Sequence, residues 1–445
     1  MWLPEVAPPV ISFVTLILGI ALGVRPIEVQ ADSTVSTVEF RLDGRLLSVL
    51  TAPPWKLVVD FGAPMPHELV AVARGGDGAE IGRAVQRLNV PRSIAEATLS
   101  LLAGTGGRGR AARLTWESAL SERPERVELT LDGQPLAPGD LARIALPDFR
   151  PADVHVLRAV LDFKEGTQAT AELLVGGVKR EAPNGPETLR GETQAELTAV
   201  PVVFSGRAPK ESEMEEWFLA NGKPVRVEAV EESPGEFVVV KDERASSWLS
   251  DLRASAYHAS YWYKVPLGKG QRLRFCWPGT RPPGEVAPGY DVFLYSTDYV
   301  APRDAHRHIV DLRQLLIEVE PPEFHSPTRL ADAVGAAALL AAAGNRPRAV
   351  LLLVAGPDDE SAMPVEWVRG YLRALRVPLF VWAKNRKIAS AWGKVEVLAT
   401  PENLKDAVAR MARAVERQRI VWLEGSHLPQ AVSLSPKARR VTLVD

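Results

Sequence analysis

The stretch Phe237-Val238-Val239-Val240-Lys241-Asp242-Glu243-Arg244-Ala245-Ser246 decides the fold that this sequence predicts. Its apolar, β-branched first half is typical of a buried strand, and the aspartate ends that strand at a polar turn. A helical pattern starts directly after the turn. The stretch therefore predicts one strand-turn-helix unit of a sheet that is covered by helices.

Alternating strand and helix patterns continue as far as residue 418. We expect strands at 236–241, 272–277, 291–295, 349–354, 378–382 and 395–398, and helices at 247–257, 307–319, 329–343, 365–375 and 401–417. Such alternation predicts a doubly wound, Rossmann-like α/β sheet with parallel strands. Two further apolar runs, at 420–423 and 441–444, predict closing strands in the tail from 419 to 445.

The N-terminal half carries a different pattern, which occurs twice. Asp43-Gly44 separates two alternating apolar runs, and Asp132-Gly133 does the same 89 residues later. Asp-Gly between such runs predicts a hairpin, because both turn residues need positive φ angles. His67 and His155 open matching runs 88 residues apart. We therefore predict two immunoglobulin-like β-sandwiches in tandem. Their boundaries, followed by those of a polar linker, are 24–93, 94–178 and 179–194.

An apolar run from Val10 to Val24 precedes the first predicted sandwich. At about 15 residues it is shorter than the roughly 20 that a membrane-spanning helix needs. The small residues Ala21 and Gly23 suit signal peptidase, although the first six residues include no Lys or Arg. We expect residues 1–23 to be a signal peptide cleaved near Val24, or else an uncleaved membrane anchor. Either reading predicts an exported protein, in the periplasm or outside the cell.

The charges of the chain nearly cancel, with 53 Lys and Arg against 55 Asp and Glu. A balanced chain has no overall field that attracts nucleic acid, so we expect a protein partner and no nucleic acid. Membrane contact is expected only if residues 1–23 stay attached. The single cysteine, Cys276, excludes an intramolecular disulfide and an all-cysteine zinc site. These features specify no oligomeric state.

The lead-in to the α/β region carries a further pattern. Residues 197–204 form an apolar run, Trp217-Phe218 follow a polar stretch, and Asn221-Gly222-Lys223-Pro224 forms a turn. Together with the strand that ends at Asp242, this order resembles exported bacterial proteins related to the von Willebrand factor type A (VWA) domain. The resemblance covers residues 195–418, with 195–235 as the lead-in.

The resemblance implies a divalent-cation site at the strand tips, where VWA domains gather oxygen ligands. They use an Asp-x-Ser-x-Ser turn, a threonine before a later helix and an aspartate after the next strand. Asp242, Ser246 and Thr328 match this pattern. Arg244 stands in place of a serine, and Ala355 stands in place of the last aspartate.

These two replacements oppose a cation. Alanine offers no side-chain oxygen, and an always-protonated arginine repels a cation by roughly 1–4 kcal/mol at such distances. We expect a degenerate, metal-free site in which the Arg244 guanidinium takes the cation's place and pairs with Asp242. No cofactor is expected. Mg²⁺ or Mn²⁺ would bind only if Asp358, or its neighbour Asp359, completed a site with Asp242, Ser246 and Thr328.

We predict a non-catalytic, exported interaction or adhesion protein whose sandwiches present the VWA-like domain. The candidate partner-binding residues are Asp242, Arg244, Ser246 and Thr328, with Arg244 forming a bidentate pair with an acidic group of the partner. One alternative is cation-dependent adhesion through a rescued site. Another is a structural scaffold that binds through its sandwiches or through the aromatic cluster at 257–263. An exported hydrolase has the least support, because the sequence contains no Gly-x-Ser-x-Gly and no His-Glu-x-x-His motif.

Overall fold

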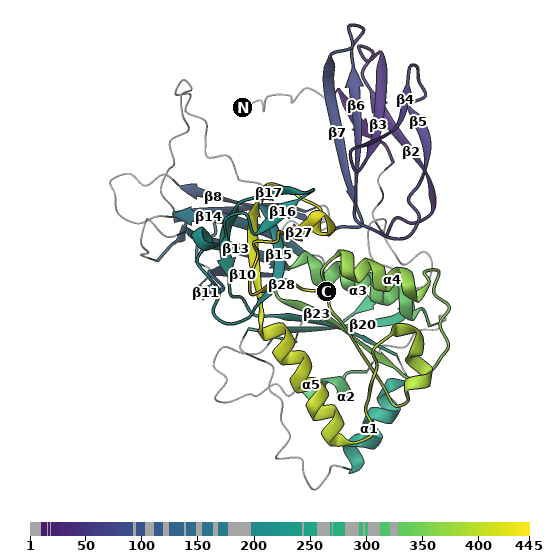
Figure 1. The fold of residues 1–445 in the computed structure, drawn as a ribbon, viewed down its shortest axis with the longest axis vertical. Coiled ribbons are helices and arrows are strands. Elements are labelled where there is room, and N and C mark those ends of the chain that lie inside the picture. Colours follow the sequence, from purple (N-terminus) through teal and green to yellow (C-terminus); the bar gives the residue numbers. More distant parts are fainter. Residues whose placement is uncertain are drawn as a thin grey trace. The chain divides into compact units, whose positions relative to one another are not determined.

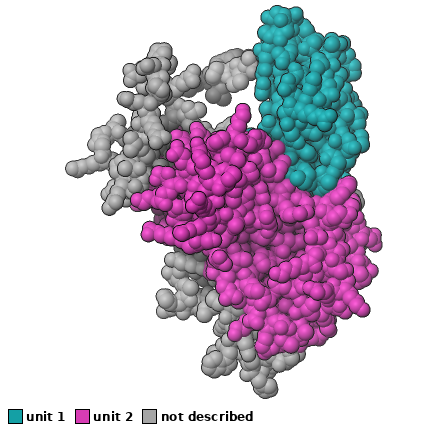
Figure 2. All heavy atoms as spheres, viewed as in Figure 1, with its two compact units in different colours: residues 1–90 teal, residues 91–445 magenta. Residues whose placement is uncertain are grey.

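The chain divides into two compact units, Met1–Val90 and Pro91–Asp445, which Figure 2 shows in different colours. The structure is a computed structural model. It describes residues 10–445 except 16, 18, 92–94, 103–110, 119–123, 138, 148–153, 163–167, 177–196, 243, 256–267, 269, 281–292, 297–298, 301–311 and 321–327. The predicted linker at 179–194 and the aromatic cluster at 257–263 lie outside the described residues.

Unit 1 is a β-sandwich of two antiparallel sheets, with strand orders β1-β2-β5 and β4-β3-β6-β7 (Figure 1). Its strands are β1 (Ile11–Phe13), β2 (Val24–Ala31), β3 (Thr37–Leu42), β4 (Arg45–Leu50), β5 (Lys56–Asp60), β6 (His67–Arg74) and β7 (Glu80–Leu88). Alternate residues of these strands, among them Ile27, Phe40 and Leu69, face inward and form one buried core. Three strands on one sheet and four on the other are expected of an immunoglobulin-like module.

Part of the apolar N-terminal run is a strand of the first sandwich. Residues 11–13 form β1, which pairs antiparallel with β2, and Ile11 and Ala21 are buried in the core of the sandwich. No helix in the described residues is long and apolar enough to cross a membrane. Cleavage near Val24 would therefore remove residues that are buried in this sandwich, and the assignment of 1–23 as a signal peptide or anchor stays a prediction. The apolar run was ambiguous because a short buried strand and a leader share the same composition.

The first region of unit 2 is a second sandwich with the same plan, with sheet orders β12-β9-β8 and β11-β10-β13-β14. Its strands are β8 (Ala95–Leu102), β9 (Ala111–Ser118), β10 (Arg126–Leu131), β11 (Gln134–Leu136), β12 (Ile144–Ala145), β13 (Val154–Asp162) and β14 (Gln168–Gly176). Strand for strand, these sheets match those of unit 1, with β8 in the place of β1. The repeat predicted from the sequence is therefore a repeat of topology.

A polar contact occurs at the same place in both sandwiches. Asp43, at φ 49° in the β3–β4 turn, accepts hydrogen bonds from the backbone N–H of Glu68 and from Nδ1 of His67, at 2.9 and 2.7 Å. Asp132, at φ 51°, accepts the equivalent bonds from Val156 and His155, at 2.8 and 2.6 Å. The Asp-Gly and His pattern of the sequence therefore corresponds to a clasp that ties each hairpin to the neighbouring strand.

The lead-in and the tail fold together into a third β-unit. Its sheets have the orders β18-β26-β15-β28 and β17-β16-β27. The strands are β15 (Leu197–Phe204), β16 (Phe218–Ala220), β17 (Lys223–Val225), β18 (Val227–Glu231), β26 (Gln418–Glu424), β27 (Val432–Leu434) and β28 (Val441–Leu443), with short 3₁₀ helices η2 (Glu211–Met214) and η4 (Pro429–Ala431). The predicted closing strands β26 and β28 thus pair with the lead-in, and the α/β region is inserted between β18 and β26.

The inserted region is a seven-stranded sheet in the described residues, with the order β21-β20-β19-β23-β24-β25 and β22 also on β20. The strands from β20 to β25 in this order are parallel, whereas β21 and β22 run antiparallel to β20. The strands are β19 (Glu236–Lys241), β20 (Arg272–Thr280), β21 (Phe293–Tyr295), β22 (Tyr299–Val300), β23 (Arg348–Val354), β24 (Leu379–Ala383) and β25 (Glu396–Val397). The strand predicted at 291–295 is therefore an antiparallel edge strand, which otherwise parallel sheets often carry.

Helices cover both faces of this sheet. They are α1 (Ala245–Ser255), α2 (Leu312–Glu318), α3 (Leu330–Ala343), α4 (Val365–Ala374) and α5 (Pro401–Glu416), with a 3₁₀ helix η3 (Arg386–Trp392). Figure 1 shows α3 and α4 on one face and α1, α2 and α5 on the other. All six residues of β19 are buried. The sequence of a central strand that is covered on both faces is a continuous apolar run, and Phe237 to Val240 have this pattern.

A buried ionic cluster joins the second sandwich to the rest of unit 2. Glu128 on β10 lies between Arg346, at 3.2 Å, and Arg272 of β20, with which it forms a short ion pair. Burial alone would raise the pKa of Glu128, but the charges of Arg346 and Arg272 outweigh it and hold that pKa at about 2. Charges this deep require close partners, so the cluster fixes the sandwich against the sheet.

A second buried pair lies beside the first. Arg158 on β13 is 2.6 Å from Glu231 at the end of β18, and both side chains are almost completely buried. The same guanidinium donates to the backbone oxygen of Asn345 at 2.8 Å and lies 5.3 Å from the centre of the Trp422 ring. Gly133 packs so close that a Cβ there would lie 2.0 Å from the Glu232 oxygen. The second sandwich thus forms a single body with the lead-in unit.

Glu128→Gln should lower the free energy of unfolding at pH 7 by roughly 3 kcal/mol, because the folded-state pKa lies about 2.5 units below its ordinary value. A lowered carboxylate pKa stabilises the fold above pH 4.5, and this contribution disappears as the pH falls towards 2. The difference between wild type and variant should therefore shrink in acid. Urea unfolding at pH 7 and pH 3 measures it.

The matched control is Glu80→Gln, since Glu80 pairs with Arg83 on the exposed face of β7. This variant should change stability little. An equal effect of Glu128→Gln at both pH values would contradict the charge argument.

Candidate functional site

The carboxyl ends of the parallel strands form one edge of the sheet. Lys241, Leu353 and Trp382 are in register on β19, β23 and β24. The residues that follow them, including Asp242, Ala355 and Lys384, therefore emerge side by side. Neighbouring strands lie roughly 5 Å apart, so the β19 and β24 tips are separated by roughly 10 Å. Ligands of such sheets bind at this edge, which makes it the candidate site.

Asp242 is fully buried at the end of β19. Its Oδ1 accepts the backbone N–H of Arg244 at 3.1 Å, and its Oδ2 accepts the backbone N–H of Ala355 at 3.1 Å. Two nitrogens of the Arg244 side chain donate to the same two oxygens, both at 3.2 Å. The carboxylate thus ties the tip of β19 to that of β23, and all its hydrogen bonds come from donors of the chain itself.

Arg244 bridges two carboxylates. Besides its two bonds to Asp242, its Nη1 donates to Oδ2 of Asp358 at 2.8 Å. These bonds, first to Asp242 and then to Asp358, raise the pKa of Arg244 above its ordinary value. The Arg244 side chain is 45% exposed and that of Asp358 is 75% exposed. The pairing expected between Arg244 and Asp242 is present, and the outer side of the guanidinium remains open to water.

Gly356 provides the surface on which the guanidinium lies. A Cβ at this position would approach Nη1, Cζ and Nη2 of Arg244 to 2.5–2.6 Å. Any side chain at 356 would therefore push the guanidinium away from Asp242. The glycine that follows β23 belongs to the site for this steric reason.

The residues at the strand tips do not fit a divalent cation. A cation there needs free carboxylate oxygens, but those of Asp242 are occupied by four N–H donors, two of them from a fixed positive charge. Among the described residues, no group of three or more His, Cys, Asp or Glu is arranged to hold a metal ion. Arg244 supplies the positive charge that a cation would bring.

The other two predicted residues are separate from this ion triad in the described structure. Ser246 lies on α1, and its buried Oγ has no hydrogen-bond partner among the described residues. Thr328 is partly buried before α3, and its backbone oxygen accepts the N–H of Glu360 at 2.8 Å. Asp242, Arg244 and Asp358 are therefore brought together, whereas hydrogen bonds link neither Ser246 nor Thr328 to them.

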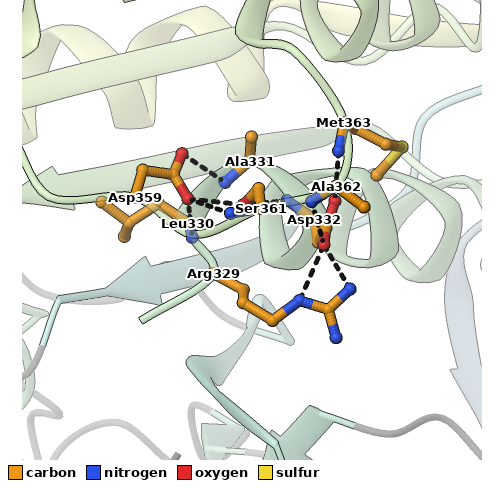
Figure 3. Close-up of polar contacts among 8 residues, drawn as sticks. All are labelled: Arg329, Leu330, Ala331, Asp332, Asp359, Ser361, Ala362 and Met363. Atoms are coloured by element: carbon orange, nitrogen blue, oxygen red, sulfur yellow. Dashed lines mark hydrogen bonds and ion pairs between the residues drawn. The ribbon is translucent and has the colours of Figure 1, made fainter. Parts of the chain in front are cut away.

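Asp359 has a structural task, as Figure 3 shows. Its two oxygens accept the backbone N–H groups of Leu330 and Ala331 at 2.9 and 3.1 Å, at the start of α3. The first N–H groups of a helix lack partners within it, and an acidic cap also suits the helix dipole. Both oxygens of Asp359 therefore cap α3.

Asp332, in the first turn of α3, binds the loop that contains Asp358 and Asp359. It accepts the backbone N–H groups of Ala362 and Met363 at 3.0 and 2.9 Å, and Nε of Arg329 donates to it at 2.8 Å (Figure 3). The loop that carries Asp358 is thus fixed from both sides. This rigidity positions the Asp358 carboxylate opposite Arg244.

Lys241 is a buried charge next to the site. Its Nζ donates to the backbone oxygen of Val319, just beyond the end of α2, at 2.7 Å, and to that of Ile317, in the last turn of α2, at 3.4 Å. Burial lowers the pKa of Lys241 to about 8, against the opposing effect of the Glu320 charge. The ammonium group satisfies helix-end carbonyl groups that otherwise lack donors.

The tip of β24 adds positive charge to the same edge. Lys384, Arg386 and Lys387 follow this strand directly and are exposed. Lys384 lies 3.6 Å from Asp251 of α1, an exposed pair that contributes little to stability. The edge therefore presents Arg244 and a basic loop on one side, with Asp358 as the carboxylate opposite Arg244.

Sequence reasoning missed the capping role of Asp359 and Asp332 and the role of the β24 loop. The pair Asp359 and Ser361, two residues apart, is a common turn signal that could have indicated a cap. The basic run 384–387 was visible in the sequence, and its position after a predicted strand places it on the same edge as Asp242.

No protein-family model matches this chain, and no curated protein matches it. Similar solved structures include the fibronectin(III)-like modules of Clostridium thermocellum CbhA, with 17% identity and a TM-score of 0.16, over 18% of this chain and 92% of that one. Human COPII-coat protein Sec24c has 8% sequence identity and a TM-score of 0.26, and the match covers 44% of this chain and 40% of that one. A structure from a 1.5-MDa bacterial ice-binding adhesin has 15% sequence identity and a TM-score of 0.15, and the match covers 46% of this chain and 77% of that one. Likenesses this low support no argument about fold or function.

Lys241→Met should remove a pH dependence of stability between pH 8 and 10. The unfolded chain keeps the lysine proton up to pH 10.5, whereas the folded chain releases it near pH 8, so the wild type gains stability as the pH rises. Relative to the variant, that gain should approach roughly 3 kcal/mol. Urea unfolding across this range measures it, with the exposed Lys387→Met as control. Parallel curves for wild type and Lys241→Met would contradict the assignment.

Mg²⁺ or Mn²⁺ titrated into the chelator-treated full chain should give no saturable heat, because Arg244 occupies the site. Arg244→Ser combined with Ala355→Asp restores the missing oxygens and should create saturable binding. Isothermal calorimetry measures both. Saturable binding by the wild type that Asp242→Ala abolishes would show instead that a cation shares the site.

Proposed function

We propose that this protein is a non-catalytic binding protein whose inserted α/β region is a degenerate, metal-free VWA-like domain. In this proposal the carboxyl edge of the sheet binds an acidic segment of a protein partner. The observation that carries it is the half-exposed Arg244, held by Asp242 at the strand tips where a VWA domain would hold a cation. Interaction or adhesion is the corresponding biological role.

The geometry favours an acidic partner for electrostatic reasons. Arg244 presents an open side to solvent, and Lys384, Arg386 and Lys387 lie on the neighbouring strand tip. Arginine pairs with carboxylates through two parallel hydrogen bonds, and flanking lysines accelerate encounter with an acidic partner. An acidic peptide segment therefore matches both the centre and the rim of this surface.

Asp358 determines how such a partner would bind. It is the exposed carboxylate on Nη1 of Arg244, at 2.8 Å, whereas Asp242 is buried behind the guanidinium. A partner's carboxylate would replace Asp358 and leave the pair with Asp242 intact. Asp358 thus competes with the partner's carboxylate for Nη1 of Arg244, so removal of the Asp358 charge should strengthen binding.

The finding that no helix in the described residues could cross a membrane is compatible with export. The leader at residues 1–23 stays a prediction, although Ile11–Phe13 pair with β2 in the first sandwich. Action in the periplasm or outside the cell is part of this proposal, and it is supported by the apolar N-terminal run and by the resemblance to exported VWA-related proteins.

The test uses a fluorescent hexaglutamate peptide and the full chain, with binding followed by anisotropy at low ionic strength. Lys384→Glu combined with Lys387→Glu should weaken binding about tenfold, since each close charge pair contributes about 1 kcal/mol under these conditions. Asp358→Asn should strengthen binding several-fold, because it removes the competing carboxylate. Arg244→Ala should abolish binding above background.

Lys210→Glu combined with Lys223→Glu is the matched control, because it makes the same charge change on exposed residues of the lead-in. It should leave the affinity unchanged. Circular dichroism checks that Arg244→Ala is folded, since this variant unpairs the buried Asp242. If folded Arg244→Ala binds like the wild type, or if Asp358→Asn weakens binding, the proposed site is wrong.

A further inference from the structure

Between residues 10 and 23, strand β1 and the described residues on either side of it are held in unit 1 largely through the main chain. The backbone oxygen of Val10 accepts the N–H of Asp32 at 2.9 Å, and the N–H groups of Val14 and Thr15 both donate to the Glu28 oxygen. Gly23 exchanges two bonds with the opposite strand end, to Gly62 and from Phe61. Main-chain bonding of this kind is how proteins bind extended peptides as an added strand.

Two buried side chains of the sandwich also bind the main chain of this segment. Asn89, 3% exposed, accepts the N–H of Ala21 at 2.6 Å and donates to its oxygen at 2.8 Å. Gln86, 1% exposed, donates to the oxygen of Thr15 at 3.3 Å. The Asn89 amide also donates to the Met65 oxygen at 2.8 Å, so it is held in place to bind the main chain of the segment on its other side.

The groove is also shaped for the side chains of the segment. Ile11 and Ala21 are buried in the core, whereas Val14 is 55% exposed. Gly82 on β7 leaves room for Val10, since a Cβ there would lie 3.0 Å from the Val10 Cβ. The groove therefore accepts a segment with a large apolar residue at the position of Ile11 and a small residue at the position of Ala21.

In the second sandwich, the position that corresponds to this groove is filled by strand β8. There β8 pairs with β9 along eight residues, Ala95 to Leu102. In unit 1 the equivalent strand, β1, pairs with β2 over only three residues. The first sandwich thus has the same acceptor position with a shorter and less tightly paired strand in it.

We propose that the groove between β2 and β7 of unit 1 is a strand-acceptor site, filled in cis by residues 10–15 and 19–23 and able to take the same residues of a second copy in trans. The occupant in trans is a second copy because the groove fits this segment through Gly82 and Asn89. This proposal is independent of the strand-tip site, since it involves no residue of the α/β region.

The test uses the full chain with a specific protease site inserted between Leu22 and Gly23. After cleavage, the protein is unfolded in urea, separated from its N-terminal fragment, and refolded with a fluorescent peptide of residues 10–22. Saturable incorporation should follow, and it should restore the unfolding transition of unit 1. The uncut protein should bind the same peptide at least tenfold more weakly, because its groove is filled.

Peptide variants test the register. Ile11→Asp in the peptide should weaken incorporation at least tenfold, because it places a charge in the core. Val14→Asp is the matched control and should have little effect, since that side chain is exposed. Equal incorporation of both variants, equal binding to the uncut protein, or a cut protein that refolds fully without any peptide would overturn the proposal.

Discussion

The ion pair between Arg158 and Glu231 is the interaction on which the arrangement of unit 2 depends. It joins a strand of the second sandwich to the last residue of β18, where the chain enters the α/β region. Two charges this deeply buried are stable only while they stay together, because either alone would lack both water and a partner. The Glu128 cluster repeats the same constraint a few residues away. The second sandwich is therefore a fixed support for the α/β region and does not act as a spacer.

At the strand tips, too, a charge is held by a buried partner, since Arg244 pairs with the buried Asp242. A bound cation must be taken from solution, and its occupancy follows the supply of that ion. A covalently attached guanidinium is always present and always charged. Because Asp242 orients it through both oxygens, the planar group presents a defined face to solvent. Recognition at this edge would then depend on ionic strength and would be insensitive to chelators.

Much of the local structure could be predicted from the sequence. The apolar run before Asp242 predicted β19 to the residue, and Asp-Gly predicted both hairpins, because these signals act over a few positions. The pair of Arg244 with Asp242 was also foreseeable, since the two residues are close in sequence. Partners such as Glu128 and Arg346 lie 218 positions apart, and no local pattern encodes which buried charges meet. The pairing of Ile11–Phe13 with β2 could not be predicted, because apolar composition does not distinguish a leader from a core strand.

The insertion of the α/β region between β18 and β26 has a mechanical consequence. Glu231 and Ile420 are cross-strand neighbours, so the points where the chain enters and leaves the inserted region are separated by a single strand spacing. Tension transmitted along the polypeptide would therefore pass across the β18–β26–β15 pairing and bypass the helices and the parallel sheet. While that clamp holds, the binding edge keeps its shape even when the molecule is stretched.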